Sequence, residues 1–194
     1  AGYAVNVVSG TLEVEDVTIV GGLYTSGTSL VATNTNISQA SASRHAIYAY
    51  NCAVTINSGT YHNDNAGNAA VFAYGSSVVT INNGTFSIDN GKQTFGWTSC
   101  LLDANAGGKY VINGGEFKGH FRVQANSTME ITGGTFENTH NEAYNIIGTA
   151  VVKGGTFTDD AAKNFAGKYL AENFELGEDG KVVPVAAKVN DKGY

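Results

Sequence analysis

Residues 129–136 read MEITGGTF, a short β-type alternation followed by a Gly turn and an aromatic residue. The same phrase occurs five more times, as EDVTIVGGLY (15–24), AVTINSGTY (53–61), VVTINNGTF (78–86), KYVINGGEF (109–117) and AVVKGGTF (150–157). The last Gly of successive copies is 19 to 37 residues apart. A strand-forming repeat near this length indicates a solenoid, because each unit can bury its apolar side only against its neighbours.

An upstream strand precedes five of the six phrases, separated from them by short linkers rich in Asn, Gly and Ser. These strands are predicted at 46–50, 70–74, 101–105, 121–124 and 146–147. Strand, tight turn, strand, Gly turn and aromatic together predict one coil of a parallel β-helix. The sequence therefore predicts an all-β fold, a single-stranded right-handed parallel β-helix of about six coils over residues 1–157. Segment 25–44 could contain one further, degenerate coil around Leu30-Val31-Ala32.

Alternation within the phrases predicts which side chains face the core. One row is expected to be aliphatic, and a second row, directly after the Gly turn, is expected to stack aromatic rings along the solenoid. The predicted aliphatic row is Ile19, Ile56, Ile81, Ile112, Ile131 and Val152; the predicted aromatic row is Tyr24, Tyr61, Phe86, Phe117, Phe136 and Phe157. A shared turn position is expected to form an amide ladder of Asn57, Asn82 and Asn113.

Residues 158–194 are predicted to form a C-terminal cap and tail, because the repeat pattern stops there. Residues 159–167 read as a short helix with an Asp N-cap and with Gly167 as its stop. Residues 174–176 and 181–183 read as a hairpin. An open solenoid end exposes a strand edge and core side chains, so a covering element is needed at this position.

Composition excludes several classes of protein. The 194-residue chain has a net charge of −6, and its 11 Lys and Arg residues are scattered, so we expect no nucleic-acid partner. No apolar run approaches the ~18 residues of a membrane helix, so no membrane insertion is expected. Cys52 and Cys100 fall two coils apart, which is beyond the reach of a disulfide.

The upstream strands also predict an outward-facing group of side chains. If the small and aliphatic residues of 46–50 and 70–74 point inward, four aromatic residues point outward on adjacent coils: Tyr48, Tyr50, Phe72 and Tyr74. The same face continues at Asp103 and Arg122, and Trp97 in the preceding loop could join it. Aromatic rings exposed on a low-charge sheet indicate a partner.

Three interpretations of these outward residues stay open. Loops could fold over the rings and make them ordinary packing. The face could be a homo-oligomer interface, as in a trimeric fibre. It could also bind glycans, because aromatic rings beside polar side chains suit the apolar faces and hydroxyl rims of sugars.

The coil phrase resembles those of right-handed parallel β-helix proteins of the pectate-lyase-like superfamily. More closely, GGTF-type repeats followed by FAGKYLAENFEL (165–176) are similar to repetitive surface proteins of gut bacteria and of the phages that infect them. The resemblance implies a non-enzymatic fibre, decoration or adhesion module, displayed outside the cell on a virion or bacterial surface. Its implied partners are other virion or cell-surface proteins, further copies in a homotrimer, or a glycan; no cofactor is expected.

The alternative is a carbohydrate-active enzyme of the same fold, a polysaccharide lyase or a tailspike-like glycoside hydrolase. Lyases of this kind need clustered carboxylates for Ca²⁺ with a basic residue, and hydrolases need closely grouped carboxylates. The two arginines, Arg44 and Arg122, fall on different coils, and Asp159-Asp160 lies where a helix cap is needed. Four histidines, His45, His62, His120 and His140, form at most an opportunistic metal patch. We therefore assign no catalytic and no metal-binding residues.

Overall fold

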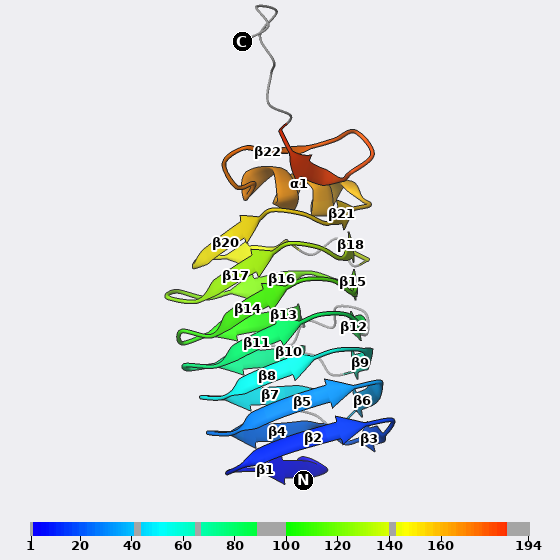
Figure 1. Cartoon of the computed structure of the whole chain (residues 1–194), viewed down its shortest axis with the longest axis vertical. Helices are drawn as coiled ribbons and strands as arrows, with labels where there is room; N and C mark the ends of the chain where they lie inside the picture. Colours follow the sequence, from blue (N-terminus) through cyan, green and yellow to red (C-terminus); the bar gives the residue numbers. More distant parts are fainter. Residues whose placement is uncertain (1, 41–43, 65–66, 89–99, 140–142, 186–194) are drawn as a thin grey trace, which may run out of the picture.

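Three parallel sheets run the length of the molecule, and in every coil the chain passes through one strand of each sheet (Figure 1). The computed structural model describes residues 2–40, 44–64, 67–88, 100–139 and 143–185. Each sheet contains seven strands. The chain is therefore an all-β parallel β-helix of seven coils, with the N-terminus at one end of the stack and a small cap at the other (Figure 1).

The sheets are named A, B and C in the order in which each coil visits them. Sheet A contains β1 (Val5–Val7), β4 (Leu23–Ser26), β7 (Ile47–Tyr50), β10 (Ala69–Tyr74), β13 (Cys100–Asn105), β16 (Phe121–Val123) and β19 (Asn145–Ile146). Sheet B contains β2 (Thr11–Glu15), β5 (Ser29–Thr33), β8 (Ala53–Ile56), β11 (Val78–Ile81), β14 (Lys109–Ile112), β17 (Thr128–Ile131) and β20 (Thr149–Val152). Sheet C contains β3 (Thr18–Val20), β6 (Thr35–Gln39), β9 (Gly59–Asn63), β12 (Thr85–Ile88), β15 (Glu116–Lys118), β18 (Thr135–Glu137) and β21 (Thr156–Phe157).

The structure has one coil more than the six phrases predict. The additional coil lies in the segment in which the sequence leaves a degenerate coil open. Leu30-Val31-Ala32 is the centre of β5, which pairs in register with β2 and β8, and β6 follows directly. Leu30 and Ala32 are fully buried, so this coil contributes to the core like its neighbours.

The predicted register of the first phrase is wrong. Ile19 lies in β3 and pairs with Ile37 of β6, so it belongs to sheet C and not to the aliphatic row of sheet B. Tyr24 lies in β4 and pairs with Tyr48, which places it on the outside of sheet A. The physical reason is that Gly22 turns the chain from sheet C into sheet A, whereas Gly59 and its later counterparts turn it from sheet B into sheet C.

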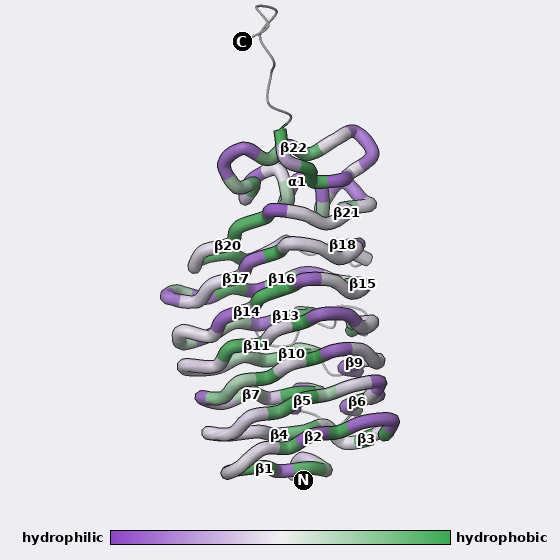
Figure 2. The backbone as a smooth tube through the Cα atoms, in the orientation of Figure 1, coloured by the Kyte–Doolittle hydropathy of each residue, from purple (hydrophilic) through white to green (hydrophobic). Residues whose placement is uncertain are grey.

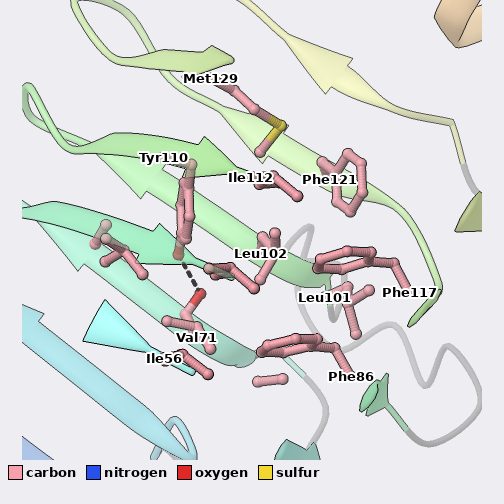
Figure 3. Close-up of a cluster of buried hydrophobic side chains, with 14 of the residues drawn as sticks. Ile56, Val71, Phe86, Leu101, Leu102, Tyr110, Ile112, Phe117, Phe121 and Met129 are labelled. Atoms are coloured by element: carbon pink, nitrogen blue, oxygen red, sulfur yellow. Dashed lines mark hydrogen bonds between the residues drawn. The ribbon is translucent and has the colours of Figure 1, made fainter. Parts of the chain in front are cut away.

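The other five phrases are in the predicted register. Ile56, Ile81, Ile112, Ile131 and Val152 form one fully buried row of sheet B. The aromatic row of sheet C stacks Tyr61, Phe86, Phe117, Phe136 and Phe157 with ring centroids 4.7–5.0 Å apart and interplanar angles of 5–14°. Figure 3 shows Phe86 and Phe117 lying parallel, with Phe121 beside them. Burial of the aliphatic row and stacking of the aromatic row therefore both stabilise the regular spacing between successive coils.

Tyr110 brings one polar group into this core. Its ring replaces an aliphatic side chain in the row of Val79 and Met129, and it is fully buried. The hydroxyl donates to the carbonyl oxygen of Val71 at 2.7 Å, the dashed line in Figure 3. Burial raises the pKa of Tyr110 well above its usual range. The hydroxyl therefore stays protonated and links sheet B to sheet A across the interior.

The predicted amide ladder is confirmed at the corner between sheets B and C. Asn82 donates to Asn57 at 2.9 Å, and Asn113 donates to Asn82 at 3.0 Å. The Gly that follows this corner is needed for close approach as well as for its backbone angle. At Gly59, φ is +120° and an added Cβ would lie 2.0 Å from the carbonyl oxygen of Thr35. Only glycine fits there without displacing the neighbouring coil.

The predicted cap covers the C-terminal end of the stack. It consists of α1 (Asp160–Lys168) and a hairpin of β22 (Phe174–Leu176) and β23 (Val182–Pro184), drawn beyond β20 and β21 in Figure 1. Asp159 is the N-cap and accepts from the backbone N–H of Ala162 at 2.9 Å. The helix continues one residue beyond Gly167, so the predicted Gly stop is wrong; the tail from 186 lies outside the described residues.

Hydropathy along the chain follows this architecture. Figure 2 shows hydrophobic and hydrophilic stretches alternating along the coils.

Cys52 and Cys100 are both free and buried, as the two-coil separation predicts. Among the described residues, no helix has both the length and the apolar character required to cross a membrane.

Candidate functional site

The outer surface of sheet A carries a row of side chains in strict register. Six consecutive coils contribute Tyr24, Tyr48, Phe72, Asp103, Arg122 and Asn145. A second row, two residues further along the strands, contributes Ser26, Tyr50, Tyr74 and Asn105. Parallel pairing without a bulge keeps equivalent side chains about one strand spacing apart. Aromatic residues thus gather on the N-terminal half of the sheet and a charged pair lies on the C-terminal half.

We call the aromatic group the aromatic face and define it as Tyr3, Tyr24, Tyr48, Tyr50, Phe72 and Tyr74. Its rings are in continuous contact. Tyr24 and Tyr48 meet edge to face with centroids 5.2 Å apart, and Tyr50 stacks on Tyr74 at 5.6 Å with an interplanar angle of 14°. Tyr3 packs against Tyr24 at 5.7 Å. The five tyrosines are partly exposed, so one side of the cluster remains open to solvent.

Phe72 differs from the tyrosines because it is covered. Only 9% of its surface is exposed, and the imidazole of His45 stacks on it with ring centroids 4.3 Å apart. His45 is held in place by a hydrogen bond from the backbone N–H of Ala69 to its Nδ1 at 2.9 Å. Phe72, Ala69 and Cys100 form a small buried cluster on the outside of the sheet. One of the four predicted outward aromatics is therefore packing, while Tyr48, Tyr50 and Tyr74 remain accessible.

The hydroxyls of Tyr3 and Tyr48 remain protonated at neutral pH. Burial raises the pKa of Tyr3 to about 12, and the hydrogen bond that its hydroxyl oxygen accepts from the backbone N–H of His45 opposes that shift. Burial and the neighbouring tyrosines also raise the pKa of Tyr48. A protonated phenol can both donate and accept a hydrogen bond. The face therefore combines ring surface with neutral polar groups.

Asp103 and Arg122 form a buried ion pair rather than an exposed polar rim. Their side chains are 0% and 11% exposed, and the guanidinium donates to Oδ2 of Asp103. Desolvation raises the pKa of Asp103, opposed by the hydrogen bond and the charge of Arg122. Oδ1 of Asp103 is buried without a hydrogen-bond partner. The pair is placed as the sequence predicts, on neighbouring coils, but it is not available to a ligand at the surface.

Trp97, the last predicted member of the group, lies outside the described residues. Three members of the site were missed by sequence reasoning: Tyr3, Tyr24 and His45. The alternation of LYTS, with Leu23 and Thr25 inward, could have placed Tyr24 once β4 was assigned to sheet A. No local signal points to His45 or Tyr3, because each reaches the face from outside the predicted strands.

His45 should make the protein sensitive to acid. Burial, followed by the charge of Arg122, lowers the pKa of His45 to about 3 in the folded chain, against 6.5 for the free side chain. Between these values the unfolded chain binds the proton more strongly, so the free energy of unfolding falls as pH decreases from 6.5 towards 3. We expect roughly 2 kcal/mol of this loss between pH 7 and pH 4, less than the full shift implies because the imidazole is partly exposed.

Urea unfolding of the parent chain, His45→Gln and His62→Gln at pH 7, 5.5 and 4 measures this effect. The His45 variant should lose most of the slope over this range, whereas the His62 variant should retain it. Equal slopes in all three proteins would assign the acid sensitivity to other groups.

Metal binding has no support within the described ranges, where no three His, Cys, Asp or Glu side chains are grouped to hold an ion. His62 lies in β9 of sheet C, His45 precedes β7 of sheet A, and His120 is buried between β15 and β16. His140 lies outside the described residues. Comparisons of the chain with family models, with curated proteins and with solved structures found no match.

Proposed function

We propose that the protein is a rigid surface-displayed module that binds carbohydrate through its aromatic face. One observation carries the proposal: Tyr24, Tyr48, Tyr50 and Tyr74 form a continuous, partly exposed patch on the regular outer surface of sheet A. A contiguous aromatic patch on a protein with few charged residues needs a partner. Tyrosine provides large contact area with few rotatable bonds, so little conformational freedom is lost on binding.

Sugars fit the chemistry of this patch better than peptides or lipids. A pyranose ring offers an apolar C–H face to an aromatic ring and hydroxyl groups at its rim. The stacked rings of Tyr50 and Tyr74 supply the platform, and their hydroxyls with Asn105, the next residue in their row, supply donors and acceptors. Successive rings are separated by about the distance between neighbouring strands, which suits a ligand that runs along the solenoid axis.

The coils support recognition by keeping the patch in one conformation. Side chains anchored on paired strands lose little entropy when a ligand binds, which favours affinity without any further contact. The similarity of the GGTF repeats to surface proteins of gut bacteria and their phages supports display outside the cell, on a bacterium or a virion. Assembly with other surface proteins is part of the same proposal, and a homotrimer is its main structural alternative.

A glycan array screened with three proteins tests the proposal. The first is the parent chain, the second is Tyr50→Ser/Tyr74→Ser, and the third is the control Tyr169→Ser, a partly exposed tyrosine on the cap. Phe72 is left intact because it is buried. We expect the double variant to lose at least tenfold in affinity for the glycans that the parent binds, and the control to retain it.

Two outcomes would contradict carbohydrate recognition. One is a parent chain that binds no glycan, and the other is equal binding by the double variant. Sedimentation of the same proteins then separates the alternatives, because a trimer interface on this face predicts a trimeric parent and a monomeric double variant.

A further inference from the structure

Sheet C carries a second row of functional side chains, on a different face from the aromatic cluster. Consecutive coils place Ser38, His62, Ser87, Lys118 and Glu137 in register on its outer surface. Ser87 thus lies between a histidine on one neighbouring strand and a lysine on the other. The proposed function uses none of these residues.

Hydrogen bonds join three of the polar groups into a chain. Oγ of Ser87 lies 2.7 Å from Nδ1 of His62, and Nε2 of His62 bonds a carboxylate oxygen of Asp64. His62 belongs to β9 and Ser87 to β12, so cross-strand register brings them together from 25 residues apart. Asp64 follows β9 directly and approaches the imidazole from the opposite side.

The proton positions follow from the chemistry of the partners. An ionised carboxylate can only accept, so the hydrogen of neutral His62 is on Nε2 and points at Asp64. Nδ1 then carries a lone pair, and the Ser87 hydroxyl must donate to it. This is the arrangement in which a histidine, oriented by a carboxylate, removes the proton of a serine nucleophile.

We propose that Ser87, His62 and Asp64 form a hydrolytic site for carboxylic esters. Ser87 Oγ bonds to the ester carbonyl carbon while its proton moves to Nδ1 of His62. Collapse of the tetrahedral adduct breaks the ester C–O bond, and Nδ1 returns the proton to the departing alcohol. Water then attacks the acyl-serine, giving its proton to Nδ1; the carboxylic acid leaves, and Ser87 Oγ recovers the proton.

Neighbouring residues supply part of what the reaction requires. Lys118 is the register partner of Ser87, so its side chain starts one strand away and can bring a positive charge to offset negative charge on the carbonyl oxygen. A small depression of about 70 Å³ adjoins His62 on the side away from Ser87, over β3, β6 and β9, and is lined by Thr18, Asn36, Ile37, Ser38 and Thr60 as well. Ser87 is not part of this lining, so the depression does not define the acyl group of the substrate.

Acylation by 4-nitrophenyl acetate tests the site in the full chain. Release of nitrophenol gives the rate, and peptide mass mapping locates the acetyl group. We expect one acetyl group on Ser87. The acylation rate should fall about 100-fold or more in Ser87→Ala and His62→Gln, and about tenfold in Asp64→Asn. The control Ser29→Ala, a strand serine on sheet B, should react like the parent. Circular dichroism checks that each variant is folded.

The comparison also separates a real site from incidental reactivity. Any exposed histidine or lysine can attack an activated ester, but neither gives an acyl-serine that depends on His62. Acetyl groups found only on lysines, or a rate unchanged in Ser87→Ala, would reduce the three residues to a surface hydrogen-bond network and overturn the proposal.

Discussion

Replacing Phe117 by alanine is expected to lower the free energy of unfolding by about 3–5 kcal/mol. Phe117 is 1% exposed and lies between two parallel rings, Phe86 at 4.9 Å and Phe136 at 4.8 Å, with Phe121 against its edge. The substitution removes the ring and leaves a cavity that strand pairing on both sides prevents from closing. It also removes two stacked pairs, each worth about 0.5–1.5 kcal/mol beyond burial.

Thermal unfolding followed by circular dichroism measures this effect, and a Tm about 10 °C lower is expected for a chain of this length. Phe117→Leu should cost less than half as much, because most of the volume is kept. Val20→Ala is the surface control, since Val20 is 72% exposed, and should change stability by less than about 0.5 kcal/mol. A Phe117→Ala protein as stable as the control would mean that the aromatic row does not hold the coils together.

The fold was predictable wherever the repeat marks the corner between sheets B and C. From Gly59 onwards every phrase has its Gly at that corner, and the predicted inward rows are confirmed residue by residue. The first two coils could not be placed in this way. Gly22 marks a different corner, and the second coil has Ile37 where later coils have an aromatic residue. A phrase matched by residue type alone does not say which corner it occupies.

The candidate sites were also predictable only in part: the sequence predicts the direction of a strand side chain but not its exposure. Alternation alone places Tyr48, Tyr50 and Tyr74 on the outside of sheet A, because side-chain direction is a local property of a strand. Whether an outward side chain is exposed depends on what packs over it, and His45 reaches Phe72 from outside the strands. His62 and Ser87 each directly follow the aromatic residue of their phrase, so the predicted register already makes them neighbours. Alternation does not show the side-chain conformations that bring the imidazole to the hydroxyl of Ser87 and to Asp64.

Removing the carboxylate of Asp103 is expected to destabilise the protein by about 3–5 kcal/mol. Asp103→Leu keeps a similar volume but removes the carboxylate that accepts a hydrogen bond from the guanidinium of Arg122, which is 11% exposed. Glu130→Leu is the matched control, because Glu130 pairs with Lys153 at 2.8 Å on the surface, with both side chains about 40% exposed. That exposed pair is expected to contribute less than about 1 kcal/mol.

The double variant Asp103→Leu/Arg122→Met shows whether the ion pair itself stabilises the fold or whether only the loss of one partner destabilises it. Desolvation opposes burying either group, and the raised pKa of Asp103 reflects that opposition despite the adjacent guanidinium. Replacing both charges by apolar groups should therefore recover most of the stability that Asp103→Leu loses, as measured by urea unfolding. If the double variant were as unstable as the single one, the pair itself would be stabilising sheet A. Recovery would instead show that the fold tolerates the ion pair without depending on it. The instability of Asp103→Leu would then come from keeping the buried guanidinium of Arg122 after its carboxylate partner is removed.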